Sequence, residues 1–331
     1  MIIKTIQKTN IKVSSVGLGT WAIGGVFWGG TDEKEAERAI NASIDEGVNF
    51  IDTAPAYGFG LAEELVGKII KNKREKVVIA TKCGLVWDKP SATFHYSFPL
   101  PGGNKHKDVF RNLSRKSIQQ EIKQSLSRLK TDYIDIYITH WPDPNTPIQE
   151  TAGALLDLKQ KGYIRAVGLS NVNIDILKGF SDYIDIDVDQ EHYNIIDRKI
   201  EFDIIPFCLQ NNITIIAYGA LAQGLLSGKI NPERKFTPDD ARLLFNFERF
   251  KPENIALINN LLKKYLGPIA EKHRCTISNI AVASIIQDNN VVALCGARNE
   301  LQAKENANSG RIILDEEDKK MIDLFISSYK L

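Results

Sequence analysis

Residues 134–169 decide the fold of this chain, because they read IDIYIT (134–139), HWPDPNTPIQETAGALLDLKQKGYIR (140–165) and AVGL (166–169). The first and last segments are short, apolar runs of the kind found in strands buried on both faces of a parallel sheet. Between them, Ile148, Ala152 and Leu155 recur with helical spacing, Thr146 with Pro147 predicts the N-cap and first turn, and Gly162 predicts the helix end. The stretch therefore predicts one strand–helix–strand unit.

The same alternation extends along the whole chain in both directions. Six further apolar runs can be recognised, and with the two above the eight runs are 16–19, 50–51, 77–80, 134–138, 166–169, 186–188, 213–217 and 291–295. Eight β-α alternations without a break in composition favour a closed (β/α)8 TIM barrel, an α/β fold, over an open doubly wound sheet. We expect one domain spanning residues 1–331.

Several elements are expected outside the barrel. Residues 3–6 and 11–13 predict an N-terminal β-hairpin, and residues 252–272 and 316–329 predict two extra helices. Asp32 and Glu35 predict a capping box for the first helix, which Gly47 would end. Ser114 predicts a helix cap after the third strand. Long loops at the C-terminal rim are expected at 85–113 and 220–250.

Composition excludes several classes of protein. The net charge is +1 with both signs mixed, which argues against binding to nucleic acid or a membrane surface. No run approaches the 18 apolar residues of a membrane span. The start is too quickly polar for a secretory signal, and the four cysteines form no metal or disulfide pattern. We therefore expect a cytoplasmic protein without a metal site, in which Cys83 is inert rather than reactive.

Four polar residues stand at or just after the C-terminal ends of three of the predicted strands. Asp52 and Tyr57 follow residues 48–51, Lys82 follows 77–81 and His140 follows 133–139. A phenol, an ammonium, a carboxylate and an imidazole at one rim can protonate a carbonyl oxygen near neutral pH. Each residue taken alone also has an ordinary interpretation: Asp52 as a cap, Lys82 as a solvated side chain or a Schiff-base nucleophile, and His140 as a packing residue.

Five motifs occur in order at the ends of predicted strands: Phe50-Ile51-Asp52-Thr53-Ala54-x-x-Tyr57-Gly58, Ala80-Thr81-Lys82, Thr139-His140-Trp141-Pro142-Asp143, Gly168-Leu169-Ser170-Asn171 and Gly296-Ala297-Arg298. In this the chain resembles the aldo-keto reductase superfamily, and more closely its bacterial oxidoreductase branch, from about residue 16 to 308. The resemblance implies a barrel that binds a nicotinamide dinucleotide without a Rossmann domain. Consistently, no G-x-G-x-x-G fingerprint opens a helix anywhere in the chain.

The resemblance implies a separate chemical role for each of the four rim residues. Tyr57 would donate the proton to the carbonyl oxygen of an aldehyde or ketone. Lys82 would lower the pKa of that phenol by stabilising the phenolate, and Asp52 would keep Lys82 charged. His140 would donate to the carbonyl oxygen or orient it.

The resemblance also implies a cofactor site. Ser170, Asn171 and Gln190 would bind the nicotinamide carboxamide, and Tyr218 would stack on the nicotinamide ring. Arg298 would read a 2′-phosphate, assisted by Arg242, so NADPH is favoured over NADH. Lys229 would offset the pyrophosphate charge. The full predicted set is Thr20, Trp21, Asp52, Ser170, Asn171, Gln190, Tyr218, Gly219, Ala220, Leu221, Gln223, Gly224, Lys229, Arg242, Gly296, Arg298, Gln302, Glu305 and Asn306.

One position departs from the family pattern. Gly219-Ala220 stands where Ser-Pro is common after the stacking aromatic residue, so a phosphate-facing hydroxyl and a rigid turn are both missing. Aromatic residues near the rim predict a substrate pocket made of Trp21, Trp28, Tyr57, Trp87, His140 and Trp141, with the 94–96 stretch as a further candidate. We interpret His192 and His273 as structural, and His95 and His106 as loop residues.

Three functions are compatible with this pattern. The first is NADPH-dependent, reversible carbonyl reduction of a small molecule. The second is a barrel that binds nicotinamide cofactors as a sensor without catalysis, and the third is a Schiff-base lyase that uses Lys82. The complete set of four rim residues favours the reductase.

Overall fold

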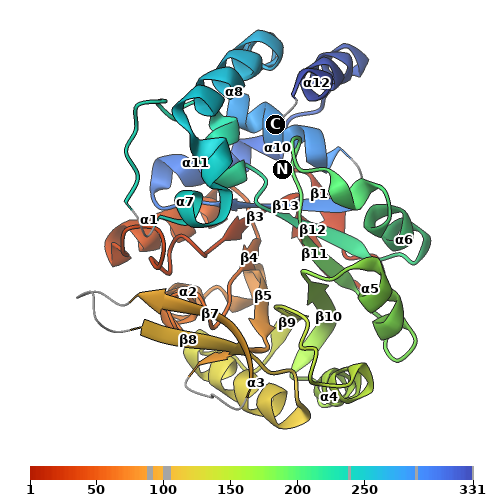
Figure 1. Ribbon diagram of the computed structural model, residues 1–331. Coiled ribbons are helices and arrows are strands. Elements are labelled where there is room, and N and C mark those ends of the chain that lie inside the picture. The colour runs from red at the N-terminus through yellow and green to blue at the C-terminus, as the bar shows by residue number, and fades with distance from the viewer. Residues whose placement is uncertain (88–91, 100–105, 238–239, 288–289, 330–331) are drawn as a thin grey trace.

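Eight parallel strands close into a barrel in the computed structural model of the chain (Figure 1), which describes residues 1–87, 92–99, 106–237, 240–287 and 290–329. Around the barrel the strands follow the order β10-β11-β12-β13-β3-β4-β5-β9. The predicted (β/α)8 barrel is thereby confirmed, and each of the eight apolar runs contributes one strand. The strands are β3 (Val16–Gly19), β4 (Phe50–Asp52), β5 (Val78–Cys83), β9 (Ile134–Thr139), β10 (Ile164–Ser170), β11 (Val188–His192), β12 (Thr214–Tyr218) and β13 (Val291–Gly296).

Helices connect the strands and surround the barrel (Figure 1). The largest apolar cluster lies between the outward side chains of the strands and the helices. None of the helices within the described ranges is both long and apolar enough to cross a membrane. The helices are α1 (Glu33–Asp45), α2 (Leu61–Ile70), α3 (Arg115–Leu129), α4 (Ile148–Gln160), α5 (Ile174–Ser181), α6 (Ile204–Gln210), α7 (Ala241–Asn246), α8 (Pro252–Tyr265), α9 (Gly267–Lys272), α10 (Ile277–Ile286), α11 (Glu300–Ser309) and α12 (Glu316–Ser328).

Helix α1 begins and ends where its capping residues predict. The Asp32 carboxylate accepts hydrogen bonds from the backbone N–H groups of Lys34 and Glu35, and Gly47 follows the helix at a φ of +86°. The predicted capping box is incomplete, because the Glu35 carboxylate pairs with Arg38 instead of returning to the cap. Ser114 caps α3 as predicted, by accepting from the backbone N–H of Ser117.

Two helix boundaries differ from the prediction. Helix α4 has Pro147 at its N-cap, and the Thr146 hydroxyl donates to Asp143 Oδ2 at 2.6 Å rather than capping the helix. The helix predicted over residues 252–272 is two helices, α8 and α9. Pro268 lies in the first turn of α9, where its missing N–H and its ring prevent α8 from continuing.

The first rim insertion is a small sheet rather than a long loop. Strands β6 (Leu85–Trp87), β7 (Thr93–Pro99) and β8 (His106–Arg111) pair antiparallel in the order β6-β8-β7. This pairing gives hydrogen-bond partners to the backbone N–H and C=O groups of the insertion. It also buries Phe98 and Val109 against Ala56. Residues 88–91 and 100–105 of this predicted loop lie outside the described residues.

The second insertion consists of short helical turns between β12 and α8. They are η3 (Ala222–Ser227), α7 and η4 (Phe247–Phe250), and residues 238–239 lie outside the described part of the chain. Two further 3-10 turns precede β5 and α6, η1 (Arg74–Lys76) and η2 (Lys199–Glu201).

The predicted N-terminal hairpin is formed by β1 (Ile3–Thr5) and β2 (Lys12–Ser14). The hairpin inserts Ile6 and Ile11 of its turn and Val13 of β2 into the apolar cluster inside the barrel. The backbone N–H of Gln7 donates to the Thr214 hydroxyl, at the start of β12. The hairpin thus covers the N-terminal end of the barrel. A functional site is therefore expected at the C-terminal end.

Candidate active site

Asp52, Tyr57 and Lys82 meet at the C-terminal end of the barrel. Asp52 ends β4, Tyr57 lies in the turn after it, and Lys82 lies in β5 with none of its surface exposed. The Lys82 Nζ atom donates to Asp52 Oδ1 at 2.7 Å, to the Thr53 carbonyl oxygen at 3.0 Å and to Tyr57 Oη at 3.2 Å. An ammonium carries three protons, so these three acceptors account for all of them.

The electrostatics of this group differ from the prediction. Burial raises the pKa of Tyr57 well above its ordinary value, and the nearby charge of Asp52 raises it further. The net pKa of the phenol therefore lies above its ordinary value, not below it as the sequence suggested, whereas stabilisation of the phenolate by Lys82 stays a prediction. Burial also lowers the pKa of Lys82, and the charge of Asp52 opposes that change. A desolvated site disfavours the charged form of a group, and burial is the largest cause of both pKa shifts.

His140 stands directly after β9 and faces Tyr57. The two ring centroids are 5.8 Å apart and the ring planes are nearly perpendicular. Burial lowers the pKa of His140 well below its ordinary value, and the positive charge of Lys82 lowers it further, so the imidazole is neutral. Its Nδ1 atom is buried without a hydrogen-bond partner among the described residues. An unpaired acceptor costs less here than an unpaired N–H, which favours the tautomer with the proton on Nε2.

Both carboxylate oxygens of Asp52 are engaged. Oδ1 accepts from Lys82, and Oδ2 accepts from Nε2 of the buried Gln190 at 2.8 Å. The Thr20 hydroxyl donates to the backbone carbonyl of Asp52 at 3.0 Å. Asp52 thus joins the predicted proton-delivery group to Gln190, one of the residues predicted to bind the nicotinamide carboxamide.

Asn171 connects the other predicted carboxamide and ring-stacking residues. Its Nδ2 atom donates to the His140 carbonyl oxygen at 2.8 Å and to Ser170 Oγ at 3.0 Å, and its Oδ1 atom accepts from Tyr218 Oη at 2.7 Å. Ser170 Oγ in turn donates to the Gln190 carbonyl oxygen. One amide side chain therefore links the ends of β9, β10 and β12.

The predicted pyrophosphate loop is a tight turn after β12 that contains Leu221, Gln223 and Gly224. Gln223 and Gly224 both have positive φ values, and the carbonyl oxygen of Gln223 accepts from Arg242 Nε at 3.2 Å. Lys229 is not free to act as a simple counter-charge, because its Nζ atom lies 2.7 Å from both carboxylate oxygens of Glu305.

The predicted adenosine site lies where β13 leads into α11. The Arg298 guanidinium donates to the carbonyl oxygens of Trp28 at 2.6 Å and Gly30 at 2.9 Å. The backbone N–H of Arg298 donates to Gln302 Oε1. Asn306 donates to the Gly296 carbonyl oxygen. A surface hollow of about 360 Å³ adjoins Arg298, and its lining is Ala22, Ile23, Thr31, Asp32, Glu35, Ala36, Arg298, Asn299 and Gln302.

The departure at Gly219 has a structural reason. Gly219 has a φ of +69°, and a Cβ atom placed there would lie 2.4 Å from Cδ2 of His192. The His192 ring also packs against Tyr218, with ring centroids 5.3 Å apart. A serine at position 219 is therefore incompatible with the position of His192. His192 is a neighbour of the predicted stacking residue and not only a structural histidine.

The predicted aromatic pocket residues fall into separate contacts around the rim. Trp21 contacts Trp28 edge to face at 5.3 Å, and Trp87 contacts Phe59 in the same way at 5.3 Å. Trp141 lies against His95 at 4.9 Å. Phe94 is 55% exposed and contacts Phe110 edge to face, at a centroid distance of 6.0 Å.

Sequence reasoning missed several residues of the small sheet and its neighbours. We call the group Phe27, Phe59, Tyr96, Phe98 and Trp141 the aromatic wall, because these rings pack over Ala56 and Leu85; Trp141 and Tyr96 were predicted near the pocket, whereas Phe27, Phe59 and Phe98 were not. His95 and His106 lie in β7 and β8 rather than in loops. Burial and the charge of Arg111 lower the pKa of His95 to about 4. Alternation of aromatic and polar residues from 93 to 98 was the available signal for a strand.

Other candidate groups have structural roles. Cys83 is buried, and burial raises its thiol pKa well above the ordinary value, which agrees with an inert thiol. His273 Nε2 lies 2.7 Å from Asp318 Oδ2, in the contact between α9 and α12. Within the described ranges no cluster of three His, Cys, Asp or Glu side chains is placed to hold a metal ion.

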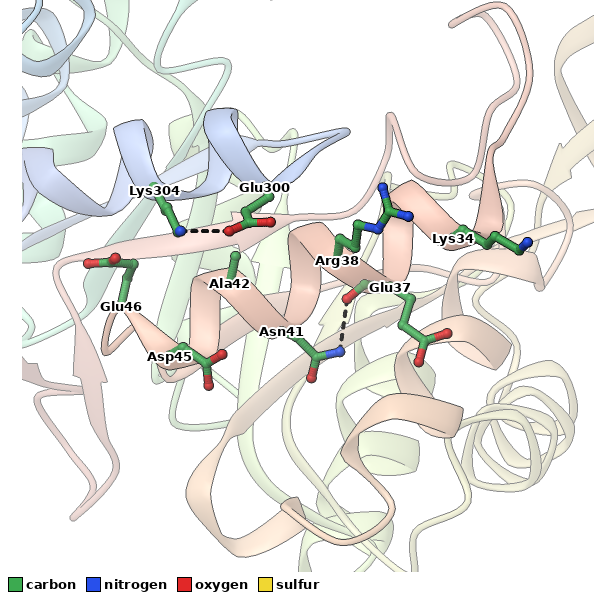
Figure 2. A pocket seen from close by; sticks show the side chains of 9 residues that line it. All are labelled: Lys34, Glu37, Arg38, Asn41, Ala42, Asp45, Glu46, Glu300 and Lys304. Atoms are coloured by element: carbon green, nitrogen blue, oxygen red, sulfur yellow. Dashed lines mark hydrogen bonds and ion pairs between the residues drawn. The ribbon is translucent and has the colours of Figure 1, made fainter.

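A second hollow, of about 580 Å³, lies between α1 and α11, away from the strand ends (Figure 2). Its lining is charged with both signs, and Lys304 pairs with Glu300 across its edge. None of the predicted site residues lines it. The residues around it are Lys34, Glu37, Arg38, Asn41, Ala42, Asp45, Glu46, Glu300 and Lys304.

Comparison with known proteins gives a consistent result over nearly the whole chain. The model of the Aldo/keto reductase family matches residues 15–326. The chain is 39% identical over 330 residues to Aldo-keto reductase YhdN of Bacillus subtilis, covering 98% of this chain and 93% of that protein. It is 38% identical over 325 residues to the NADH-specific methylglyoxal reductase of Escherichia coli, covering 95% of each.

Two solved structures have the same architecture. A glycerol dehydrogenase from Gluconobacter oxydans superimposes with a TM-score of 0.86 at 37% identity, covering 98% of this chain and 95% of that one. An aldo/keto reductase from Klebsiella pneumoniae, solved in complex with NADP and acetate, superimposes with a TM-score of 0.72 at 25% identity, again covering 98% and 95%.

Proposed function

The chain belongs to the aldo/keto reductase family and is an oxidoreductase, and on that premise we propose that it reversibly reduces a small aldehyde or ketone to the alcohol with NADPH. Tyr57 is the proposed general acid. The observation that carries this proposal is the 3.2 Å contact between Tyr57 Oη and Lys82 Nζ, together with the 2.7 Å contact between Lys82 Nζ and Asp52.

The proposed proton transfer follows from the charges at the rim. Tyr57 stays protonated near neutral pH because burial raises its pKa, so it can give its proton to a carbonyl oxygen. The developing phenolate would be stabilised by the Lys82 ammonium, which Asp52 helps to keep charged. The Nε2–H of neutral His140 would donate to the same carbonyl oxygen. Positioned acid catalysis of this kind is typically worth ~10²–10⁴-fold.

The donor and acceptor set fits a nicotinamide cofactor. Such a cofactor, when bound, supplies the hydride for the carbonyl carbon. Asn171, Ser170 and Gln190 offer amide and hydroxyl groups that match a carboxamide, and the ring of Tyr218 lies beside them. The turn at 221–224 and the start of α11 supply backbone N–H groups suited to phosphate. Arg298 and Arg242 supply positive charge near the predicted phosphates, whereas the charge of Lys229 is offset by Glu305.

We propose NADPH rather than NADH as the preferred cofactor because of Arg298. It is exposed beside a hollow large enough for part of a nucleotide, and a guanidinium suits a phosphate. The Klebsiella structure contains NADP, whereas the Escherichia coli relative is named as specific for NADH. Asp32 and Glu35 line the same hollow, and their carboxylates oppose a 2′-phosphate, so the charge balance at Arg298 decides the preference.

The geometry disfavours the Schiff-base alternative. A nucleophilic lysine must present a neutral amine to its substrate, but all three donor positions of Lys82 are directed at Asp52, Thr53 and Tyr57. A non-catalytic sensor would not require an acid beside an ammonium. We also propose that residues 1–331 act as one barrel domain, with Trp21, Trp28 and the aromatic wall around the substrate.

The test is a panel of aldehydes and ketones with NADPH and with NADH, followed by the loss of the reduced cofactor's near-ultraviolet absorbance. We expect turnover of at least some members of the panel, faster with NADPH than with NADH at low cofactor concentration. Binding of NADPH without turnover of any carbonyl compound would contradict the reductase proposal and favour the sensor.

A further inference from the structure

Asn171 adopts a backbone conformation that needs support. Its φ is +57°, in the left-handed region that costs energy for residues other than glycine, although asparagine tolerates it best. Its side chain holds three neighbours at once: the His140 carbonyl, Ser170 Oγ and Tyr218 Oη. A change in the Asn171 backbone would therefore move several of the residues proposed to meet the nicotinamide.

The backbone after Asn171 is held from outside the barrel by Glu191. On β11, Gln190 points into the barrel toward Asp52, so the next side chain, Glu191, points the opposite way, into the layer under the helices. Glu191 is only 7% exposed. Its Oε1 atom accepts a hydrogen bond from the backbone N–H of Val172 at 2.8 Å.

Glu191 is unusual among the buried acids that hold the backbone of this barrel. Asp135 accepts from the backbone N–H of Ile79 and is paired with Arg74 and Arg165. Asp187 accepts from Val167 and is paired with Lys159. Both therefore have a cation that offsets the cost of burial. For Glu191 the described residues provide no such cation.

The other charges near Glu191 are negative, which makes its position costly. Asp189 lies two residues earlier on the same face of β11, has no exposed surface and has no hydrogen-bond partner for either carboxylate oxygen within the described part of the chain. Asp203 approaches from the start of α6. Burial raises the pKa of Glu191 to about 8, although the backbone N–H groups of Val172 and Asn171 oppose that rise, so near neutral pH the side chain is largely the neutral acid, whose Oε1 still accepts the Val172 N–H. These backbone contacts are the favourable interactions of the Glu191 carboxyl group.

We propose that Glu191 is a positioning residue for the cofactor. By holding the Val172 N–H, it keeps the 170–172 turn in the conformation that presents the Asn171 and Ser170 side chains to a nicotinamide carboxamide. Glu191 would act through this turn and would touch neither the cofactor nor the substrate. The inference rests on the proposed function, because it assumes that the carboxamide lies at Asn171.

The test compares two ligands on matched variants of the full chain. NADPH carries the carboxamide, whereas adenosine 2′,5′-bisphosphate has the same phosphates without a nicotinamide. Glu191→Leu removes the hydrogen-bond acceptor at similar volume, and Glu191→Gln restores it. Asp189→Leu is the matched control, since it removes a buried carboxylate from the same face without touching the turn. Dissociation constants are measured by calorimetry.

We expect Glu191→Leu to weaken NADPH binding about tenfold, the factor that corresponds to the loss of about one hydrogen bond, and to leave adenosine 2′,5′-bisphosphate binding unchanged. Glu191→Gln and Asp189→Leu should bind both ligands like the wild type. Unchanged NADPH affinity in Glu191→Leu would overturn the proposal. So would an equal loss for the two ligands, because that would indicate a general structural defect.

A further variant covers the case in which Glu191→Leu does not fold. Glu191→Asp keeps the carboxylate but withdraws it by one methylene from the Val172 N–H, so it should show the same selective loss of NADPH affinity; normal NADPH affinity in it would overturn the proposal. The wild type serves as the check on the premise. If the wild type itself does not bind NADPH, the proposed function fails, whereas normal wild-type binding with unaltered variants would refute only the role of Glu191.

Discussion

The phenol oxygen of Tyr57 lies 3.2 Å from the ammonium nitrogen of Lys82, in surroundings that disfavour the charged form of both groups. Burial keeps the phenol protonated at rest, and the ammonium is held in place by Asp52. The interaction therefore becomes strongest at the moment when the phenol loses its proton. In a reductase, such an interaction favours the transition state over the resting state.

Replacing Tyr57 by phenylalanine should remove the proton donor and leave the ring packing intact. We expect kcat for carbonyl reduction to fall by at least ~10²-fold, the typical contribution of a positioned acid. NADPH binding, measured by calorimetry, should stay close to that of the wild type. A Tyr57→Phe enzyme with near-normal kcat would show that another group delivers the proton.

Replacing Lys82 by methionine should affect both activity and stability. The substitution leaves Asp52 buried without its cation, which typically costs about 3–5 kcal/mol of folding free energy. Denaturant unfolding should show that loss, and reduction should be nearly abolished. The double variant Lys82→Met, Asp52→Asn should recover much of the stability, since no uncompensated charge remains, but none of the activity. Recovery of activity in the double variant would contradict the proposed role of Lys82.

Replacing Arg298 by alanine should separate the two cofactors. We expect NADPH affinity to fall about tenfold or more, because a charge-assisted phosphate contact is lost, while NADH affinity changes little. Lys304→Ala is a suitable control, because Lys304 is a cation on α11 that pairs with Glu300. Equal losses for NADPH and NADH would mean that Arg298 acts by holding Trp28 and Gly30 rather than by reading the 2′-phosphate.

A side chain at position 219 should be costly because of His192. Gly162→Ala is the matched control: its φ is +76° and a Cβ atom there would meet nothing within 4 Å. We expect Gly162→Ala to cost about 1 kcal/mol, the usual penalty for alanine at a positive φ, and Gly219→Ala to cost more. The excess should shrink in a His192→Ala background. An excess that persists without His192 would refute the steric explanation.

The rate of reduction should depend little on pH in the neutral range. The pKa of His140 lies well below the ordinary histidine value, so lowering the pH through about 6.5 should not charge it. The pKa of Tyr57 lies above its ordinary value, so raising the pH toward about 10 should not remove the catalytic proton. We expect a flat profile of kcat/KM through the neutral range and a fall only in the alkaline range, where Lys82, whose pKa lies below its ordinary value, loses its proton. A fall centred near pH 6.5 would show that a histidine with an ordinary pKa controls the reaction.

The barrel could be predicted from the sequence because strands buried on both faces leave a local pattern. Residues 134–138 and 213–217 are apolar at almost every position. A strand with one exposed face would instead alternate between apolar and polar residues. Polar residues such as Lys82 and His140 come at the C-terminal ends of runs of this kind. They lie at the same rim because the strands are parallel. The small sheet at 85–111 could not be predicted in this way, since its faces are partly exposed and its pattern is weaker.

The candidate site could be predicted only in part from the sequence, for a similar reason. Tyr57, Lys82, Asp52 and His140 belong to motifs, but His95 and Tyr96 reach the rim through antiparallel pairing that the sequence pattern did not reveal. The departure at Gly219 became intelligible only when His192 was found beside it. The contact between Glu191 and Val172 joins β11 to the turn after β10, across 19 positions of the chain.

The sequence by itself determined the order of strands and helices and the residue types that reach the rim, because periodicity and capping are local properties of the chain. Only the tertiary structure decided how those groups are charged and held. The pKa of Tyr57 rises rather than falls because desolvation depends on everything packed around the phenol. The 2.7 Å and 3.2 Å contacts of Lys82 likewise depend on how closely β4 and β5 approach, which is a property of the closed barrel.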